Sequence, residues 1–121
     1  MYITVSKQFQ FHAAHKIEHH PGECRNLHGH TYTVVIEATG PIQLDGDEQG
    51  MVIDFGRLKK LYNEVIHDVC DHAYLNDKFS FPTTAENLAA AFLAGLHRLD
   101  VRINAVAVSE GPGNIARAVW P

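Results

Sequence analysis

The residues best suited to chemistry in this sequence are three histidines, His15, His28 and His30. In an extended strand, side chains two residues apart point to the same face, so His28 and His30 direct both imidazoles to one side, with Gly29 between them. His15 lies on the inward row of a preceding strand pattern and supplies a third nitrogen if the two strands pair antiparallel. Three protein ligands with one open position are typical of catalytic zinc. We therefore predict that these histidines bind one divalent cation, zinc, in an active site.

Cys24 lies in a polar loop four residues before His28. A nearby cation favours its thiolate, and a thiolate so placed can remove a proton from carbon next to a polarised carbonyl or alcohol. The alternative is a closed structural site in which Cys24 is the fourth zinc ligand. Cys70 instead falls on the apolar side of a predicted helix and is interpreted as a small buried hydrophobe.

Two further polar features have both a catalytic and a structural interpretation. Asp71-His72 ends a predicted helix, where His72 can act as an acid or base beside the carboxylate, or can interact with the helix dipole. Glu110 follows an apolar strand, where its carboxylate can accept two hydrogen bonds from an aminopyrimidine-like ring or can be an exposed charge. The remaining histidines are interpreted as surface or packing residues: His12, His19, His20, His67 and His97.

Hydrophobic periodicity predicts the elements that must position these residues. Alternating apolar and polar residues predict four strands, over 3–15, from 28 through 36 to an end near Gly40, over 104–110 and over 114–120. Helical spacing predicts one helix from an N-cap at Asp54 to about Asp71. A second helix follows a capping box over Thr83-Thr84-Ala85-Glu86.

The order strand, strand, helix, helix, strand, strand predicts a single α+β domain over residues 1–121. Two helices are expected on one face of a four-stranded antiparallel sheet. The outer strands of such a sheet leave backbone donors and acceptors unpaired, and closing several subunits into a ring would satisfy them.

Charge and hydropathy exclude several partner classes. The net charge of -4 and the scattered Lys and Arg residues provide no basic stripe for nucleic acid. No apolar run approaches the roughly 20 residues needed to span a bilayer, and residues 1–11 lack a signal-peptide pattern. We expect a cytoplasmic protein that binds neither nucleic acid nor membrane.

Together, these motifs resemble the 6-pyruvoyl-tetrahydropterin synthase family over nearly the whole chain. The motifs that carry the resemblance are Ala14-His15, Cys24-x3-His28-Gly29-His30, Val52-Ile53-Asp54-Phe55, Asp71-His72-x2-Leu75, Pro82-Thr83-Thr84-x-Glu86-Asn87 and Glu110. Within the family, the spacing between Cys24 and His28 is similar to that of the queuosine-pathway branch, the 6-carboxy-tetrahydropterin synthases.

The resemblance implies the tunnelling fold (T-fold), in which two trimeric barrels stack as a homohexamer with active sites at subunit interfaces. It implies a pterin triphosphate substrate, 7,8-dihydroneopterin triphosphate, which the queuosine branch converts to 6-carboxy-5,6,7,8-tetrahydropterin with loss of acetaldehyde and triphosphate. By position, His15, His28 and His30 would hold zinc and Cys24 would be the general base. Asp71 and His72 would relay protons, and Glu110 and Thr84 would bind the pterin.

Two other functions remain open at this stage. A 6-pyruvoyl-tetrahydropterin synthase would eliminate triphosphate and retain the side chain, and Glu23 beside Cys24 resembles a glutamate that some relatives use in place of the thiol. A non-enzymatic alternative is a structural zinc-binding assembly module, which would require a complete protein shell around the metal.

Overall fold

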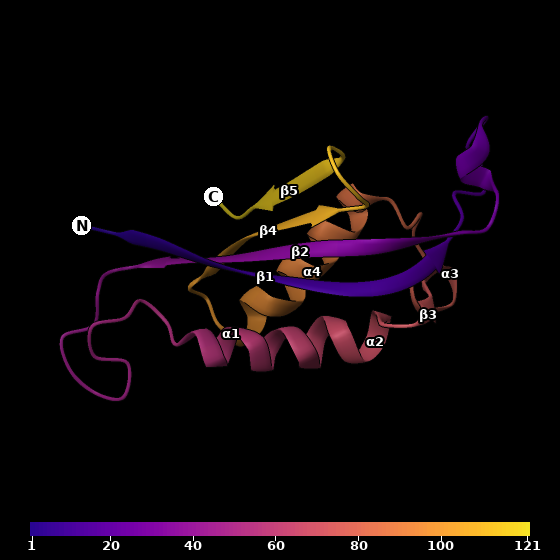
Figure 1. Cartoon of the computed structure of the whole chain (residues 1–121). Helices are drawn as coiled ribbons and strands as arrows, with labels where there is room; N and C mark the ends of the chain where they lie inside the picture. Colours follow the sequence, from indigo (N-terminus) through magenta and orange to yellow (C-terminus); the bar gives the residue numbers. More distant parts are fainter.

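Two long antiparallel strands form the centre of the sheet (Figure 1). The computed structural model describes all 121 residues, Met1 to Pro121. β1 (Ile3–His15) pairs along its whole length with β2 (His28–Gly40), and the register places His15 opposite His28. Both strands were predicted, because a period of two is strong when only one face is buried.

The sheet contains five strands in the order β3-β1-β2-β4-β5. β4 (Ile103–Ser109) and β5 (Ile115–Val119) lie within a residue of their predicted ends and pair antiparallel. The prediction of a four-stranded, wholly antiparallel sheet was wrong, because β3 (Ala73–Tyr74) pairs parallel with Ala13 and Ala14 of β1. A two-residue strand is too short to show alternation, so the sequence carries no signal for it.

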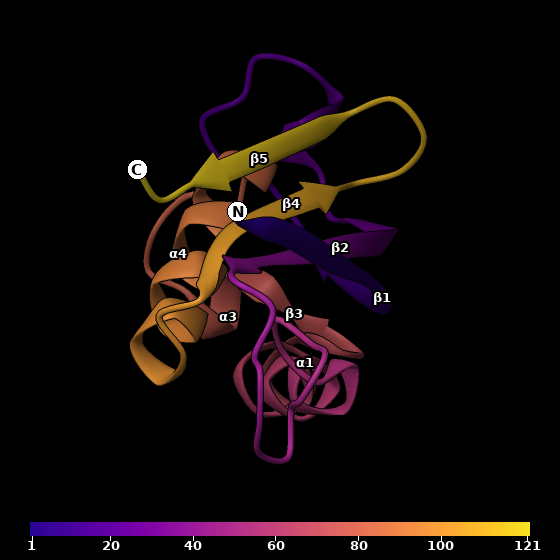
Figure 2. The ribbon, with the colours of Figure 1, turned by 90° about the vertical axis from the view of Figure 1, so that its left-hand side faces the viewer.

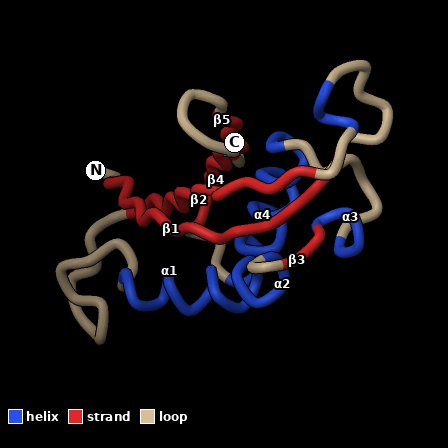
Figure 3. The backbone as a smooth tube through the Cα atoms, turned by 45° about the vertical axis from the view of Figure 1, so that its right-hand side comes forward, coloured by secondary structure: helices blue, strands red, loops and turns tan.

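Helices cover one face of this sheet, as Figure 2 shows from the end of the strands. The first helical segment is continuous from α1 (Phe55–Tyr62) through a π-helical turn, η2 (Asn63–His67), to α2 (Asp68–Cys70). α4 (Ala85–Leu99) packs against β4 and β5. Two short elements lie in the connections, η1 (Glu23–Arg25) between β1 and β2 and α3 (Leu75–Lys78) after β3 (Figure 3). No helix is long and apolar enough to cross a membrane.

The helix caps explain where the two main helices begin. The Asp54 side chain accepts from Gly56 N at 2.7 Å, as predicted. The predicted capping box was wrong in detail: Thr84 is the N-cap of α4 and accepts from Asn87 N at 3.2 Å. Thr83 is instead fully buried, and its role at the site is described below.

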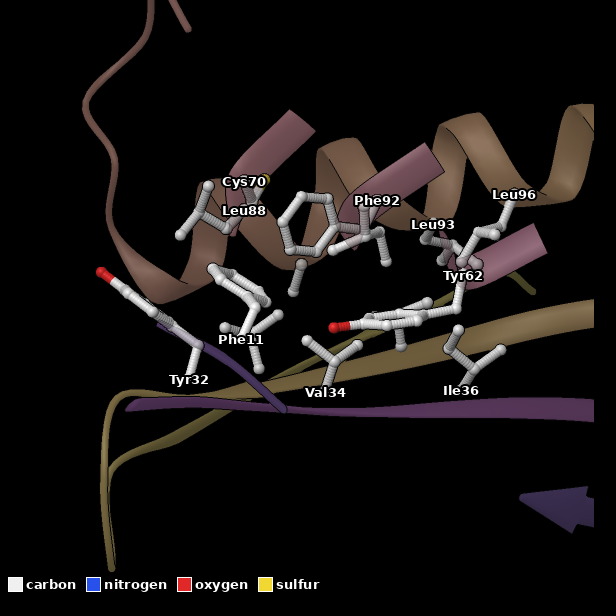
Figure 4. Packing of buried hydrophobic residues seen from close by; sticks show 14 of the residues in the cluster. Phe11, Tyr32, Val34, Ile36, Tyr62, Cys70, Leu88, Phe92, Leu93 and Leu96 are labelled. Carbon is white, nitrogen blue, oxygen red and sulfur yellow. The ribbon is translucent and has the colours of Figure 1, made fainter. Parts of the chain in front are cut away.

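The core lies between the sheet and the helices (Figure 4). Phe11 and Tyr32, from facing positions of β1 and β2, stack with ring centroids 4.9 Å apart. Phe92 of α4 meets Phe11 edge-on at 6.2 Å. Because Phe11 lies four residues before His15 on the same face of β1, this packing fixes the strand that carries the metal ligand.

Truncation of Phe92 should therefore test how strongly α4 is held to the sheet. Phe92→Ala should lower the free energy of unfolding by about 3–5 kcal/mol, because a buried aromatic is lost and a cavity remains. Leu99→Ala, at an exposed position of the same helix, should cost less than about 1 kcal/mol. Urea unfolding followed by circular dichroism measures both, and equal losses would contradict the packing described.

Candidate metal centre and active site

The three predicted ligands lie together at one end of the sheet. Ring centroids are 4.6 Å apart for His15 and His28, 5.0 Å for His15 and His30, and 4.7 Å for His28 and His30. One ligand nitrogen of each ring lies within 4.8 Å of the others. The antiparallel register produces this arrangement, because it places His15 opposite His28 and Ala13 opposite His30. This group could hold a metal ion.

Backbone carbonyls orient two of the three rings. Nδ1 of His15 donates to the Thr83 carbonyl oxygen at 2.8 Å, and Nδ1 of His28 donates to the Asn26 carbonyl oxygen at 2.6 Å. A carbonyl oxygen can only accept, so the neutral rings carry their proton on Nδ1 and leave the Nε2 lone pair free. Metal-binding histidines usually have this kind of second partner, which fixes tautomer and ring direction.

The free nitrogens fit a cation. Nε2 of His15 and Nε2 of His30 are buried and have no hydrogen-bond partner in the protein. An unpaired buried polar atom costs free energy, and a bound cation would remove that cost. Three imidazole nitrogens suit zinc and other first-row divalent ions.

Burial also keeps these rings neutral. It lowers the pKa of His15 below the ordinary value, although the hydrogen bond to the Thr83 backbone partly offsets the effect. Burial lowers the pKa of His30 as well, against the opposing influence of the Glu110 carboxylate, whose Oε2 lies 3.8 Å from Nε2. Neutral imidazole is the form that binds a metal, so the pocket favours ligation near neutral pH.

Asn76 holds the segment that orients His15. Its side chain accepts from Lys16 N at 3.0 Å and donates to the Lys16 carbonyl oxygen at 2.9 Å, which clamps the chain just after β1. The same amide oxygen accepts from Thr83 Oγ1 at 3.3 Å. The end of β1 and the start of α4 are thereby tied together around the His15 ring.

A hollow of about 700 Å³ lies beside the histidine cluster. Its lining comes from the loop after β1, the first turns of α4, and the segment from Glu110 into β5, and it includes Cys24, Thr84 and Glu110. Glu110 joins the hollow to the metal group because it also contacts His30. The volume is in the range of small-molecule sites.

Cys24 is exposed in η1 and does not belong to the group of side chains that could hold the metal. The closed site with a fourth thiolate ligand, one of the alternatives from the sequence, therefore finds no support in the geometry. Cys70 is fully buried, as predicted, and burial raises the pKa of its thiol to about 12.

Asp71 and His72 lie apart from this hollow, at the β3 edge of the sheet. His72 N donates to the His12 carbonyl oxygen at 2.6 Å, and His72 has a left-handed backbone with φ of 59°. The Asp71 carboxylate accepts from His12 N at 3.0 Å and from His72 Nδ1 at 2.7 Å. These two hydrogen bonds, the first above all, lower the pKa of Asp71. In one chain Cys24, Thr84 and Glu110 line the hollow beside the histidine group, whereas His72 lines a separate hollow together with His12 and His30.

Sequence reasoning missed several residues that support the site. Thr83 and Asn76 position His15. The only sequence signal for these two residues was their place in a polar loop, next to Thr84 and Asp77. His12 and His67 were interpreted as surface or packing residues, but both contact Asp71. The contacts of Thr83, Asn76 and His12 depend on the pairing of distant segments, so no local pattern could have revealed them. The contact between His67 and Asp71 joins residues four apart, which helical spacing could have suggested.

Fold and site together define a T-fold protein with a three-histidine group able to bind a metal. The family model described as 6-pyruvoyl tetrahydropterin synthase matches residues 4–119, and the chain belongs to this family.

Sequence relatives carry the name of the 6-carboxy branch. The chain is 38% identical over 120 residues to the 6-carboxy-5,6,7,8-tetrahydropterin synthase of Synechocystis sp., covering 97% of this chain and 93% of the relative. A putative enzyme of the same name from Archaeoglobus fulgidus is 36% identical, with 91% and 88% covered. The Haemophilus influenzae enzyme is 45% identical over 76 residues, which span 63% of this chain and 54% of that protein.

Solved structures show the same fold. The 6-pyruvoyl tetrahydropterin synthase of Caenorhabditis elegans superposes with a TM-score of 0.87 at 26% identity, covering 100% of this chain and 97% of that one. A Plasmodium vivax 6-pyruvoyltetrahydropterin synthase, in which a catalytic glutamate is replaced by cysteine, gives 0.73 at 26% identity, with 98% and 97% covered.

Replacement of one ligand should separate specific from loose metal binding. His15→Ala should weaken zinc binding by more than about 100-fold, because loss of an outer-shell partner alone costs 10–100-fold. His12→Ala, three residues earlier and exposed, should leave one zinc per chain. Metal content after gel filtration in a competing chelator measures both variants. Equal zinc in the two variants would rule out the proposed ligand set.

Proposed function

We propose that the protein is a zinc-dependent 6-carboxy-tetrahydropterin synthase. It converts 7,8-dihydroneopterin triphosphate to 6-carboxy-5,6,7,8-tetrahydropterin and releases acetaldehyde and triphosphate, a reaction of queuosine biosynthesis. The observation that carries the proposal is the position of the three histidines beside a hollow lined by Cys24, Thr84 and Glu110. The names of the sequence relatives support the choice of branch.

His15, His28 and His30 would hold the zinc, since two of their Nε2 atoms are buried without a partner. When bound, zinc supplies positive charge that stabilises negative charge developing on the substrate. The protein's own residues then have separate tasks, which follow from where each side chain lies.

Cys24 would remove a proton from the substrate side chain; its exposed position in η1, in the lining of the hollow, supports this role. Glu110 is placed to accept two hydrogen bonds from the aminopyrimidine part of the pterin, because its carboxylate lies at the wall between the hollow and His30. Thr84 lines the same hollow and can contact the ring while it caps α4.

Asp71 and His72 would pass protons to and from the substrate from a neighbouring subunit. Within one chain they lie on the β3 edge, and Glu110 follows β4, three strand positions away in the sheet order. At about 4.8 Å per strand this separation is roughly 14 Å, and the pair does not line the hollow that Cys24 and Glu110 share. A neighbouring subunit joined edge to edge could bring its own Asp71 and His72 to the hollow.

The sheet edges support this assembly. β3 covers only Ala13 and Ala14 of β1, so most of β1 has an unpaired edge. At the other edge, β5 and the residue after it expose apolar side chains, Ile115, Val119 and Trp120. Pairing these edges between subunits would bury both features, and we include a homohexamer of two trimeric rings in the proposal.

Loss of the thiol should stop the reaction without emptying the metal site. Cys24→Ala should reduce turnover of 7,8-dihydroneopterin triphosphate by at least about 100-fold, as expected for loss of a general base. Zinc content should stay at the wild-type level. Acetaldehyde release and mass spectrometry of the pterin measure the reaction, and Cys70→Ala is the matched thiol control that should remain active.

The same variant tests the structural zinc module. In that alternative Cys24 would be a ligand, so Cys24→Ala would lose zinc and wild-type protein would turn nothing over. Retained zinc with abolished turnover supports the enzyme. Retained zinc with unchanged turnover would refute the role of Cys24 as the base.

The second candidate is a 6-pyruvoyl-tetrahydropterin synthase, like the solved C. elegans relative of that name. Glu23 adjoins Cys24 in η1, and the P. vivax relative is described as having a catalytic glutamate. This candidate predicts a product that retains its three-carbon side chain and no acetaldehyde. Mass spectrometry of the wild-type product distinguishes the two branches, and Glu23→Gln shows whether the carboxylate contributes to either product.

Mixing two inactive variants tests whether each active site is built from residues of two subunits. Cys24→Ala and His72→Ala should each be inactive alone, but a co-refolded equal mixture should regain roughly a quarter of wild-type activity, because random assembly pairs an intact Cys24 with an intact His72 at that frequency. Activity after mixing is the measurement. No recovery, with hexamers formed, would contradict sites shared between subunits.

A further inference from the structure

The Asp71 carboxylate has a third neighbour besides His12 and His72. Nε2 of His67 lies 3.5 Å from Oδ2 of Asp71, the same oxygen that accepts from His72 Nδ1 at 2.7 Å. The exposed fraction of the His67 side chain is 39% and that of Asp71 is 21%, so neither group is freely rotating in solvent. His67 therefore lies beside Oδ2 of Asp71, whereas His12 N donates to the other carboxylate oxygen, Oδ1.

The π-helical turn η2 gives His67 a second fixed contact. His67 is the last residue of η2, and its Nδ1 lies 3.3 Å from the hydroxyl of Tyr62, five residues earlier. A spacing of five brings side chains together in a π turn, whereas an α-helix brings together residues three or four apart. Tyr62 is itself held by stacking on Phe9, with centroids 4.0 Å apart.

The direction of the Tyr62 hydrogen bond determines what His67 can do. Tyr62 OH donates to the Gln10 carbonyl oxygen at 3.1 Å. The hydroxyl has one hydrogen, so toward His67 it can only accept, and Nδ1 of His67 must donate. Nε2 then donates to Asp71 only when His67 carries both protons and is a cation. A neutral His67 in this arrangement presents a lone pair to the carboxylate.

We propose that His67 is a positioning residue that holds the Asp71 carboxylate toward His72 and places a positive charge behind this pair. The inference deepens the proposed function, because Asp71 and His72 are its proton relay. The titratable groups that face the pair are His12 from β1 and His67 from η2, and Tyr62 faces His67. His67 acts through Asp71 and does not touch the substrate.

The first test needs no substrate. His72 ring signals are followed by NMR across pH in the wild type and in His67→Gln, which keeps a neutral donor but removes the charge. A unit charge about 6 Å away in a water-like dielectric changes a titration midpoint by about half a pH unit. The His72 midpoint should rise by about that amount in His67→Gln, because protonated His72 no longer meets a neighbouring cation.

Glu64→Gln is the matched control, since it removes an exposed charge from the same π turn. It should leave the His72 midpoint within about 0.1 pH units of the wild type, because solvent screens its charge. Tyr62→Phe keeps the stack on Phe9 but removes the hydroxyl that fixes Nδ1. It should shift the His72 midpoint in the same direction as His67→Gln, by a smaller amount.

The second test measures turnover between pH 6 and 9. His67→Phe should lower kcat by about 10-fold at the acid end, with KM changed less than about 2-fold, because the relay is misplaced and binding is not. The loss should shrink as pH rises, since only a doubly protonated His67 can donate from Nε2 to Asp71 while Nδ1 donates to Tyr62. Compared with His67→Phe, His67→Gln should have a higher kcat at the acid end, and its loss relative to the wild type should depend less on pH.

These outcomes separate the inference from the proposed function. If wild-type protein turns over no dihydroneopterin triphosphate but the His72 midpoint moves in His67→Gln, the proposed function fails and the positioning of the pair stands. An unchanged His72 midpoint in His67→Gln would overturn the inference, as would a kcat loss that is the same at every pH. If His67→Phe does not fold, as judged by circular dichroism, the His72 midpoints of His67→Gln and Tyr62→Phe test the inference in its place.

Discussion

The metal group depends on two hydrogen bonds, each made by one imidazole proton to a backbone carbonyl oxygen. His15 donates to Thr83 and His28 donates to Asn26, which leaves both Nε2 atoms free to meet at one point. Thr83 lies 68 residues from His15, so the start of α4 must be in place before this ring has a defined direction. The requirement explains why Asn76 ties the end of β1 to the same segment. The site is thus the junction of the sheet, the loop after β1 and the start of α4.

Strand alternation divides the chemistry between two regions of the sheet. His15, His28 and His30 point to the face that the helices cover, and there burial removes protons from two of them. His12 and Thr31 point to the other face, where the His12 ring meets Thr31 Oγ1 at 3.0 Å. Asp71 and His72 join this second group through the His12 backbone. Histidines whose charged form burial disfavours and a carboxylate whose charged form hydrogen bonds favour can therefore lie close to the same two strands.

Much of this arrangement could be predicted from the sequence because it follows from short periods. The two long strands, the shared face of the three histidines and the cap at Asp54 all rest on patterns a few residues long. The parallel strand β3 was missed because two residues carry no period. The contact of Thr83 with His15 was missed for a different reason, since it depends on how distant segments meet after packing. His67 lies one helical turn before Asp71, so its contact was within reach of helical spacing and was overlooked. Sequence patterns identify which residues share a face, and tertiary packing decides which atoms they touch.

Glu110 illustrates why the hollow and the metal group must be considered together. Its carboxylate favours positive charge at His15 and His30 and opposes the effect of burial on both pKa values. Beside a bound cation the same carboxylate would still raise local affinity for positive charge, and Glu110 also belongs to the lining of the hollow. A ligand in the hollow that offers two adjacent N–H donors satisfies the carboxylate, whereas an anionic group at that position is repelled. The site thus favours a ring edge with donors at Glu110 and requires any phosphate to lie elsewhere.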